Sequence, residues 1–238
     1  MPTRKIDRFT VHYTNADELR LLKREIFTDH CYYFESKNPQ PKIIDVGAHI
    51  GLSTLYFKKL FPSSSIIAIE PHPTAVTLLE QNIWENGLTD VRVCAAATSP
   101  FAQPITLHED TDKTWLSTTS MHERAWNAEM PTTPLSHSLE SIDLASLLKE
   151  PVDLLKMDIE GMEQAVLSQL PTTTLQNIGQ AVIEFHPTAG QNIEQFVELL
   201  KQANFSITIS KQGKAITPQK ASGLSMIHAT NRHLFNQS

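Results

Sequence analysis

Cysteine is scarce in this chain, with Cys31 and Cys94 the only two among 238 residues. They lie far apart and lack the close spacing of cysteines that bind a metal. We therefore expect two thiols in a reducing compartment, and one disulfide between them is the less favoured alternative. A cytoplasmic protein is the default expectation.

Long apolar runs, a secretory leader and clusters of positive charge are also missing. No stretch reaches the roughly eighteen apolar residues that a membrane-spanning helix needs. Residues 1–8 lack the apolar segment of a signal peptide. The formal net charge is -6 and lysine and arginine form no run, which argues against a nucleic-acid-binding surface. We expect neither a membrane span nor a nucleic-acid partner.

The residues that are present fit one ordinary globular domain with a short extension. Apolar residues make up 40% of the chain and charged residues 19%, and this length can bury a sizeable core. An amphipathic helical pattern covers Ala16–Phe27 and is followed by the breaker Asn38–Pro41. We expect residues 1–40 to form an N-terminal helical cap and residues 41–238 the main domain.

From residue 42 onward, short apolar runs alternate with helical patterns. Such runs are typical of strands that are covered on both faces, and helices between them indicate parallel pairing. Two alternating segments near the end, 205–209 and 224–228, are typical of an antiparallel edge. The sequence therefore predicts an α/β fold with a doubly wound, mostly parallel sheet and an antiparallel terminal strand pair. The expected strands are 43–46, 66–69, 91–96, 152–157 and 180–185, and the expected helices are 52–61, 73–86, 161–170 and 193–200.

Residues 98–137 are the hardest part of the chain to interpret. The segment 103–108 is a candidate extra strand, whereas 109–137 is polar and typical of a loop. A stretch this long without regular structure is often a functional loop. We expect residues 98–137, together with the N-terminal cap, to choose the substrate. Regular structure then resumes with a short helix at 141–148.

A glycine turn follows the first predicted strand of the main domain. Gly47 and Gly51 permit a tight turn and a close approach of ligand to backbone. Glu70 ends the next strand, where a carboxylate can accept hydrogen bonds from both hydroxyls of a ribose. The turn lacks the third glycine of the dinucleotide fingerprint, since Thr54 stands there. This absence favours a mononucleoside-like cofactor such as S-adenosylmethionine over NAD.

Polar side chains stand at the ends of the other predicted strands as well. Asp45 ends the first strand, Asp158 and Glu160 follow the fourth, and Glu184 and His186 follow the fifth. Ligands of open parallel sheets bind at the carboxyl ends of the strands, and charges buried without a purpose are costly. The pattern predicts a site along this edge of the sheet.

Longer strings surround these positions: IIDVGAHIGLSTLYF, IAIEPHPTAVTLLEQNIWENG, VRVCAAATS, VDLLKMDIEGMEQAVL and IEFHP. Their combination of E-P-x-P after the second strand with K-x-D-x-E-G after the fourth is specific. In these features the chain resembles the FkbM family of S-adenosylmethionine-dependent methyltransferases, in register from about residue 25 to residue 187. The resemblance implies a seven-stranded class I methyltransferase fold.

The resemblance also implies residues that bind the cofactor. Glu70 would bind the ribose hydroxyls, and Pro71 would shape the adenine pocket. His49 stands where the family usually shows asparagine, and its ring can titrate near neutrality, so its contact stays open. The other residues implied to line the cofactor are Asp45, Gly47 and Gly51 on the methionine and ribose side, and Ala96 and Ala97 beside the base.

A second group of residues is expected on the acceptor side. Methyl transfer to oxygen needs an aligned hydroxyl whose proton is removed during the attack, and His186 or Asp158 could be that base. Asp158, Glu160 and Glu184 could instead hold a divalent cation such as Mg²⁺, which favours oxygen ligands. The whole predicted group is Lys156, Asp158, Glu160, Glu163, Glu184 and His186.

Several members of this group also have a purely structural alternative. Lys156 and Glu163 could pair with neighbouring charges. Glu160 could cap the helix that begins near Gly161. His186 could be a hydrogen-bonded support rather than a catalytic group.

The sequence thus predicts an S-adenosylmethionine-dependent methyltransferase that acts on a hydroxyl of a sugar, lipid-linked or secondary-metabolite acceptor. The preference for a hydroxyl rests on the resemblance. Two alternatives stay open: an NAD-dependent oxidoreductase, and a protein that binds the cofactor without turnover. The oligomeric state is also open, although the terminal strand pair offers an edge for a homodimer.

Overall fold

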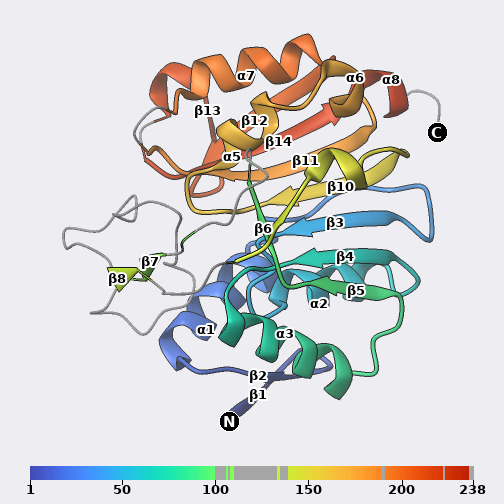
Figure 1. Ribbon diagram of the computed structural model, residues 1–238, viewed down its shortest axis with the longest axis vertical. Helices are drawn as coiled ribbons and strands as arrows, with labels where there is room; N and C mark the ends of the chain where they lie inside the picture. The colour runs from blue at the N-terminus through green and yellow to red at the C-terminus, as the bar shows by residue number, and fades with distance from the viewer. Residues whose placement is uncertain are drawn as a thin grey trace.

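The computed structural model describes residues 1–99, 106, 108–109, 133–134, 139–188, 191–221 and 223–235. Within these residues the central sheet has eight strands in the order β13-β12-β14-β11-β10-β3-β4-β5 (Figure 1). Apolar runs form its middle strands, as the sequence predicts. The strands are β3 (Lys42–Val46), β4 (Ser65–Ile69), β5 (Val91–Cys94), β10 (Val152–Met157), β11 (Ile178–Phe185), β12 (Phe205–Lys211), β13 (Lys214–Ile216) and β14 (Ser225–Asn231).

Five neighbouring strands of this sheet, from β11 to β5, are parallel. β14 lies antiparallel between β11 and β12, which confirms the antiparallel edge. The sheet has eight strands instead of seven because the chain folds back after β12, at Gln212 and Gly213, and adds the short strand β13. The strand order reverses at β3 and β10, the point where ligands of such sheets bind.

Helices connect the strands largely where helical patterns occur in the sequence. The predicted helix at 141–148 is instead a two-residue strand followed by a four-residue helix, and the region 98–137 lies mostly outside the described residues. The helices are α1 (Ala16–Lys23), α2 (Leu52–Leu60), α3 (Pro73–Glu85), α4 (Leu144–Leu147), α5 (Glu163–Ser168), α6 (Thr172–Leu175), α7 (Ile193–Gln202) and α8 (Arg232–Phe235), with a π-helix at Arg24–Thr28 and a 3-10 helix at Pro218–Lys220.

In the described part of the chain, three small two-stranded sheets accompany the central one. β1 (Thr3–Ile6) and β2 (Phe9–His12) form an antiparallel hairpin. β6 (Ala97–Thr98) pairs with β9 (Ser141–Ile142), and β7 (His108–Glu109) pairs with β8 (Thr133–Pro134).

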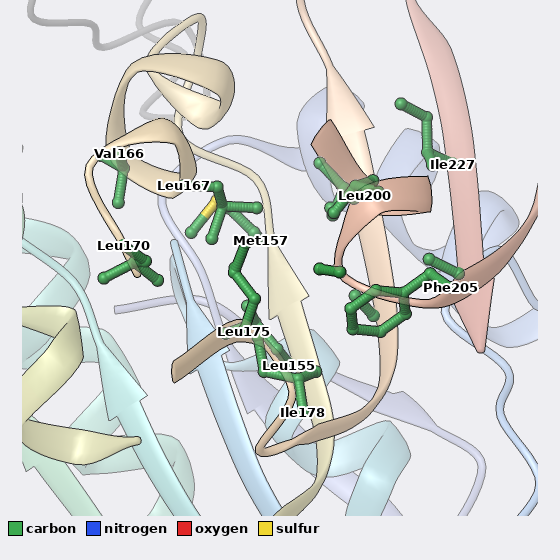
Figure 2. Packing of buried hydrophobic residues seen from close by; sticks show 14 of the residues in the cluster. Leu155, Met157, Val166, Leu167, Leu170, Leu175, Ile178, Leu200, Phe205 and Ile227 are labelled. Atoms are coloured by element: carbon green, nitrogen blue, oxygen red, sulfur yellow. The ribbon is translucent and has the colours of Figure 1, made fainter. Parts of the chain in front are cut away.

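Alternate residues of the central strands pack mainly into two large cores, one on each face of the sheet. On one face Leu155 and Met157 of β10 join Leu167 and Leu175 from the α5–α6 region (Figure 2). On the other face Leu154 packs with residues of α2 and of the N-terminal segment. Because side chains alternate along a strand, Lys156 shares this second face with Leu154. The N-terminal segment therefore covers the face that carries Lys156.

We expected the N-terminal segment to be a helical cap. It instead begins with the β1–β2 hairpin, and its helices follow this hairpin. Two side-chain amides, one on α3 and one on the residue that follows it, bind the free edge of β2. Asn82 accepts the His12 N–H (2.7 Å) and donates to the His12 carbonyl (3.2 Å), while Asn86 makes the same pair of bonds with Thr10 (2.8 Å each). The amide of Asn82 also donates to the Ile50 carbonyl (2.8 Å). One helix face thus fastens the hairpin to the domain.

Replacing Asn82 by leucine is expected to lower the free energy of unfolding by about 2–3 kcal/mol, because it leaves the partly buried backbone groups of His12 and the buried carbonyl of Ile50 unpaired. Urea denaturation measures the loss, and hydrogen exchange should show faster exchange in β2. The control Gln202→Leu changes an exposed helical amide and should cost under about 0.5 kcal/mol. Equal effects of the two substitutions would contradict the role of Asn82.

Cys31 and Cys94 are both free thiols, as the favoured expectation has it. Each is only partly buried, in different parts of the domain. Among the described residues, no helix is long and apolar enough to cross a membrane.

Candidate active site

The turn between β3 and α2 uses both predicted glycines in the left-handed conformation, with φ of +76° at Gly47 and +91° at Gly51. A Cβ at Gly47 would lie 1.7 Å from the Asp158 carbonyl oxygen, and a Cβ at Gly51 would lie 2.7 Å from Leu79 Cδ1. Only glycine fits such positions without displacing a neighbour. Gly47 therefore lets the turn after β3 touch the chain that follows β10.

Glu70 lies at the end of β4 with its carboxylate almost fully buried. One carboxylate oxygen accepts the backbone N–H of His49 (2.8 Å) and the other accepts that of His72 (2.9 Å). Each oxygen has a second lone pair, so both can still accept a hydrogen bond from a ligand. This donor and acceptor chemistry fits the two vicinal hydroxyls of a ribose.

His49 has a backbone role and a side-chain role in the turn. Its backbone adopts φ of +52°, a conformation that asparagine tolerates better than most residues, which fits the asparagine of the family pattern. Its ring Nε2 lies 3.5 Å from the buried carboxylate of Glu18 on α1. His49 therefore joins the N-terminal segment to the turn that supports Glu70.

Asp45 is fully buried on β3, and its carboxylate contacts protein groups. One oxygen accepts the hydroxyls of Ser53 (2.7 Å) and Thr54 (2.8 Å), while the other lies 3.4 Å from Lys156 Nζ. Asp45 thus fixes the start of α2 and holds a cation. Its expected place beside the cofactor stays a prediction.

Lys156 connects the glycine turn to the acidic residues after β10. Its buried ammonium donates to the Gly47 carbonyl (2.5 Å) and lies 4.0 Å from Asp158 Oδ2. Burial lowers the pKa of Lys156, but the charges of Asp45 and Asp158 outweigh burial and raise the pKa above its ordinary value. Lys156 is therefore a buried, charged lysine that forms ion pairs, and its expected role on the acceptor side stays a prediction.

Tyr32 is a site residue that the sequence did not reveal. Its hydroxyl lies 3.0 Å from Asp158 Oδ2 and 3.1 Å from Glu184 Oε2, and its ring lies under the Lys156 ammonium, 5.0 Å from the ring centre. Burial, with the charges of Asp158 and Glu184, raises the pKa of Tyr32 well above its usual range. The hydroxyl therefore keeps its proton and can donate to either carboxylate.

Glu163, completely buried at the start of α5, organises the segment after β10. One of its oxygens accepts the backbone N–H groups of Ile159 (3.2 Å) and Gly161 (3.1 Å) and lies 2.9 Å from Nδ1 of His186. The other ring nitrogen of His186, Nε2, lies 3.5 Å from Glu160 Oε2. The geometry thus fixes His186 with Nδ1 on Glu163 and Nε2 toward Glu160.

The acidic residues of this cluster raise one another's affinity for protons. Burial first, and then the charge of Asp158, raises the pKa of Glu184 to about 8. Burial also raises the pKa of Glu160 well above its usual range. Burial would lower the pKa of His186, but Glu160 and Glu163 outweigh it and raise that pKa. The cluster therefore has more buried carboxylates than nearby positive charges can balance.

The structure gathers the predicted acceptor-side residues at the carboxyl ends of β10 and β11. The set within reach of one cation differs from the predicted set of Asp158, Glu160 and Glu184. One potential ligand atom each from Asp158, Glu160 and His186 lie within 4.8 Å of one another. Glu184 instead accepts a hydrogen bond from the Tyr32 hydroxyl. β11 continues to Phe185, so Glu184 lies within the strand, whereas His186 lies just beyond its end.

The remaining predicted cofactor residues lie at the neighbouring strand ends. Pro71 follows Glu70 and is partly buried. Ala96 and Ala97 are buried just beyond β5, where the Glu70 N–H donates to the Cys94 carbonyl (3.1 Å). The ends of β3, β4 and β5 thus bring these residues to the same edge as Gly47.

Most of the chain is similar to known methyltransferases. The methyltransferase FkbM domain matches residues 45–207. The chain is 28% identical to methyltransferase sdnD of Sordaria araneosa, over 85% of this chain and 88% of that protein. It is also 28% identical to 31-O-demethyl-FK506 methyltransferase FkbM of Streptomyces tacrolimicus, over 83% of this chain and 86% of the relative.

A solved structure shows a similar fold at low sequence identity. The structure of methyltransferase FkbM from Methylobacillus flagellatus KT aligns with a TM-score of 0.51 and 14% identity, over 82% of this chain. The aligned chain spans 45% of the length of that structure. The family match and the two curated relatives, which are methyltransferases by name, argue against the alternative of an NAD-dependent oxidoreductase. Because the domain match covers more than half of its residues, the chain belongs to the FkbM family of S-adenosylmethionine-dependent methyltransferases.

Proposed function

We propose that the protein is an O-methyltransferase that transfers the methyl group of S-adenosylmethionine to a hydroxyl of a sugar, lipid-linked or secondary-metabolite acceptor. The cofactor would lie over the ends of β3, β4 and β5, and the acceptor over the ends of β10 and β11. These strand ends are adjacent in the sheet.

One observation carries this proposal: the glycine turn and the acidic cluster are in direct contact. Lys156 donates to the Gly47 carbonyl, and the Asp158 N–H donates to the Val46 carbonyl (3.1 Å). A ligand seated on the turn would therefore end beside Asp158. Such proximity is what a direct transfer between two bound molecules requires.

In this proposal, different residues of the chain bind the cofactor and the acceptor. When bound, S-adenosylmethionine supplies a methyl group on a positively charged sulfur. Glu70 would hold the ribose hydroxyls and so fix the distance between the turn and the methyl group. Asp158 would accept the hydrogen bond, and then the proton, of the acceptor hydroxyl, while Tyr32 and Lys156 hold its carboxylate in place.

The preference for oxygen is supported by a relative. The name of the Streptomyces tacrolimicus protein states that it methylates 31-O-demethyl-FK506, which is consistent with transfer to an oxygen of that compound. The cluster facing the acceptor in this chain is rich in carboxylates, which accept hydrogen bonds from hydroxyls. These carboxylates therefore suit a substrate alcohol better than an apolar carbon centre.

The direct test uses the purified full chain, S-adenosylmethionine labelled on its methyl group, and a panel of sugars, lipid-linked sugars and polyketide alcohols. Transfer of label to an oxygen of at least one acceptor is the expected result. Cofactor binding with no transfer to any acceptor would favour the alternative of a binding protein without turnover. Transfer to nitrogen or carbon alone would contradict the preference for oxygen.

Replacing Glu70 by glutamine is expected to weaken binding of S-adenosylmethionine about 10- to 100-fold. The substitution removes a charged acceptor, worth about 1.5–3 kcal/mol per hydrogen bond, and turns an amide donor toward a backbone N–H. Isothermal titration calorimetry measures the affinity. The matched control Glu80→Gln lies on the exposed side of α3 and should leave the affinity unchanged. An unchanged affinity in the Glu70 variant would place the ribose elsewhere.

A further inference from the structure

We propose that Asp158, Glu160 and His186 form a binding site for one divalent cation, preferably Mn²⁺, at the carboxyl ends of β10 and β11. The set differs from an ordinary cluster of surface acids because it includes a buried imidazole nitrogen. His186 is only 2% exposed, and Asp158 and Glu160 are 23% and 19% exposed in their side chains. The site therefore has a closed protein side and an open side.

Distances within the set suit a single ion. One ligand atom from each residue lies within 4.8 Å of the other two. His186 Nε2 lies 3.5 Å from Glu160 Oε2 and 4.0 Å from Asp158 Oδ1. Ligands about 2.1 Å from a common ion are separated by about 3–4 Å from one another, so small side-chain rotations would complete the geometry.

Glu163 gives His186 the second partner that metal-binding histidines have. Its carboxylate lies 2.9 Å from Nδ1 of His186 and is itself held by the backbone N–H groups of Ile159 and Gly161. A histidine that binds a metal through one ring nitrogen almost always donates the other N–H to a carboxylate or carbonyl. Glu163 would thus orient Nε2 toward the ion without binding it.

The charge around the site also favours a cation. Asp158 and Glu184 both lie within hydrogen-bond distance of the Tyr32 hydroxyl. Glu160 and Glu163 lie near the two ring nitrogens of His186. Among the described residues, Lys156 is the cationic side chain whose ion pairs with Asp45 and Asp158 border this cluster. Lys156 balances only part of the negative charge of these carboxylates. A bound divalent cation would balance more of it.

Two oxygen ligands and one imidazole nitrogen indicate the kind of ion. Mg²⁺ prefers an all-oxygen shell, whereas Mn²⁺ accepts carboxylates and imidazole together. Three protein ligands would leave positions for water or for an oxygen of the acceptor. If the proposed function holds, a hydroxyl bound there would lose its proton more readily; cation binding itself does not depend on that function.

The experiment titrates MnCl₂ into the metal-free full chain without S-adenosylmethionine and follows free Mn²⁺ by electron paramagnetic resonance. One ion per chain, with tenfold or more weaker binding of Mg²⁺ in competition, is the expected result. Glu160→Gln should weaken Mn²⁺ binding at least about tenfold, and Glu163→Gln about 10- to 100-fold through the orientation of His186. The matched control Glu150→Gln changes an exposed acid and should bind as the parent does.

Two outcomes would overturn the site: no saturable Mn²⁺ binding by the parent chain, or equal affinities in the Glu160 and Glu150 variants. Because Glu160 is partly exposed, its variant is expected to fold. Mn²⁺ binding can therefore still be tested on the Glu160 variant if the Glu163 variant fails to fold. Calorimetry with S-adenosylmethionine on the same samples separates the two proposals. Cofactor binding without Mn²⁺ binding removes only the cation site, and Mn²⁺ binding without cofactor binding removes only the proposed methyl transfer.

Discussion

Replacing Gly47 by alanine is expected to lower the free energy of unfolding by about 2–5 kcal/mol and to abolish cofactor binding. The left-handed backbone alone costs an alanine about 1–2 kcal/mol. The added Cβ would also lie 1.7 Å from the Asp158 carbonyl oxygen, so the turn or the end of β10 must move, at a cost typical of overpacking. Urea denaturation measures the stability, and calorimetry with S-adenosylmethionine measures the binding.

A second glycine provides the matched control for this experiment. Gly213 has nearly the same backbone conformation, with φ of +74°, but a Cβ there would meet nothing within 4 Å. Gly213→Ala should therefore cost only the conformational part, about 1–2 kcal/mol. If both variants lose the same stability, the close approach between Gly47 and Asp158 does not exist in solution.

Replacing Asp45 by asparagine should have an effect of similar size, about 3–5 kcal/mol of unfolding free energy. The change leaves the buried ammonium of Lys156 without its nearest carboxylate, and an uncompensated buried charge is strongly destabilising. Chemical denaturation provides the measurement. The control Asp29→Asn removes an exposed acid whose nearest cation, Arg24, lies 3.9 Å away, and should cost under about 1 kcal/mol.

A double-mutant cycle isolates the pair from its surroundings. Combining Asp45→Asn with Lys156→Met removes both charges, and buried pairs replaced on both sides are often close to neutral. The double variant is therefore expected to be more stable than Asp45→Asn alone. Simple addition of the two single losses would show that Asp45 and Lys156 do not interact.

Strands with continuous apolar runs were predictable from sequence because burial on both faces leaves a local signature. Val152–Met157 forms β10 with the expected bounds. β13, at Lys214–Ile216, has no such run, and it exists only because β12 offers an unpaired edge. The β1–β2 hairpin was missed for a similar reason, since its free edge is paired by the amides of Asn82 and Asn86, which lie 70 and 76 positions along the chain from their partners.

The sequence predicts those site residues that directly follow the parallel strands. Asp158, Glu160 and His186 were expected together because parallel strands bring their carboxyl ends to one edge, and the structure places them within one cation's reach. Tyr32 and Glu18 were not expected there, since side chains of the N-terminal segment reach the site through tertiary packing alone. The aromatic run Tyr32–Phe34 is visible in the sequence, but simple packing is the favoured explanation of such a run.

The contact between Tyr32 and Glu184 also determines when the site can form during synthesis. The two residues lie 152 positions apart in sequence, and a ribosome adds about 5–20 residues per second. The N-terminal segment must therefore wait on the order of ten seconds or more, with the apolar face that carries Tyr32 uncovered, before β10 and β11 emerge. The acceptor side is consequently among the last parts of the domain to be completed, and the nascent chain exposes its aromatic cap until then.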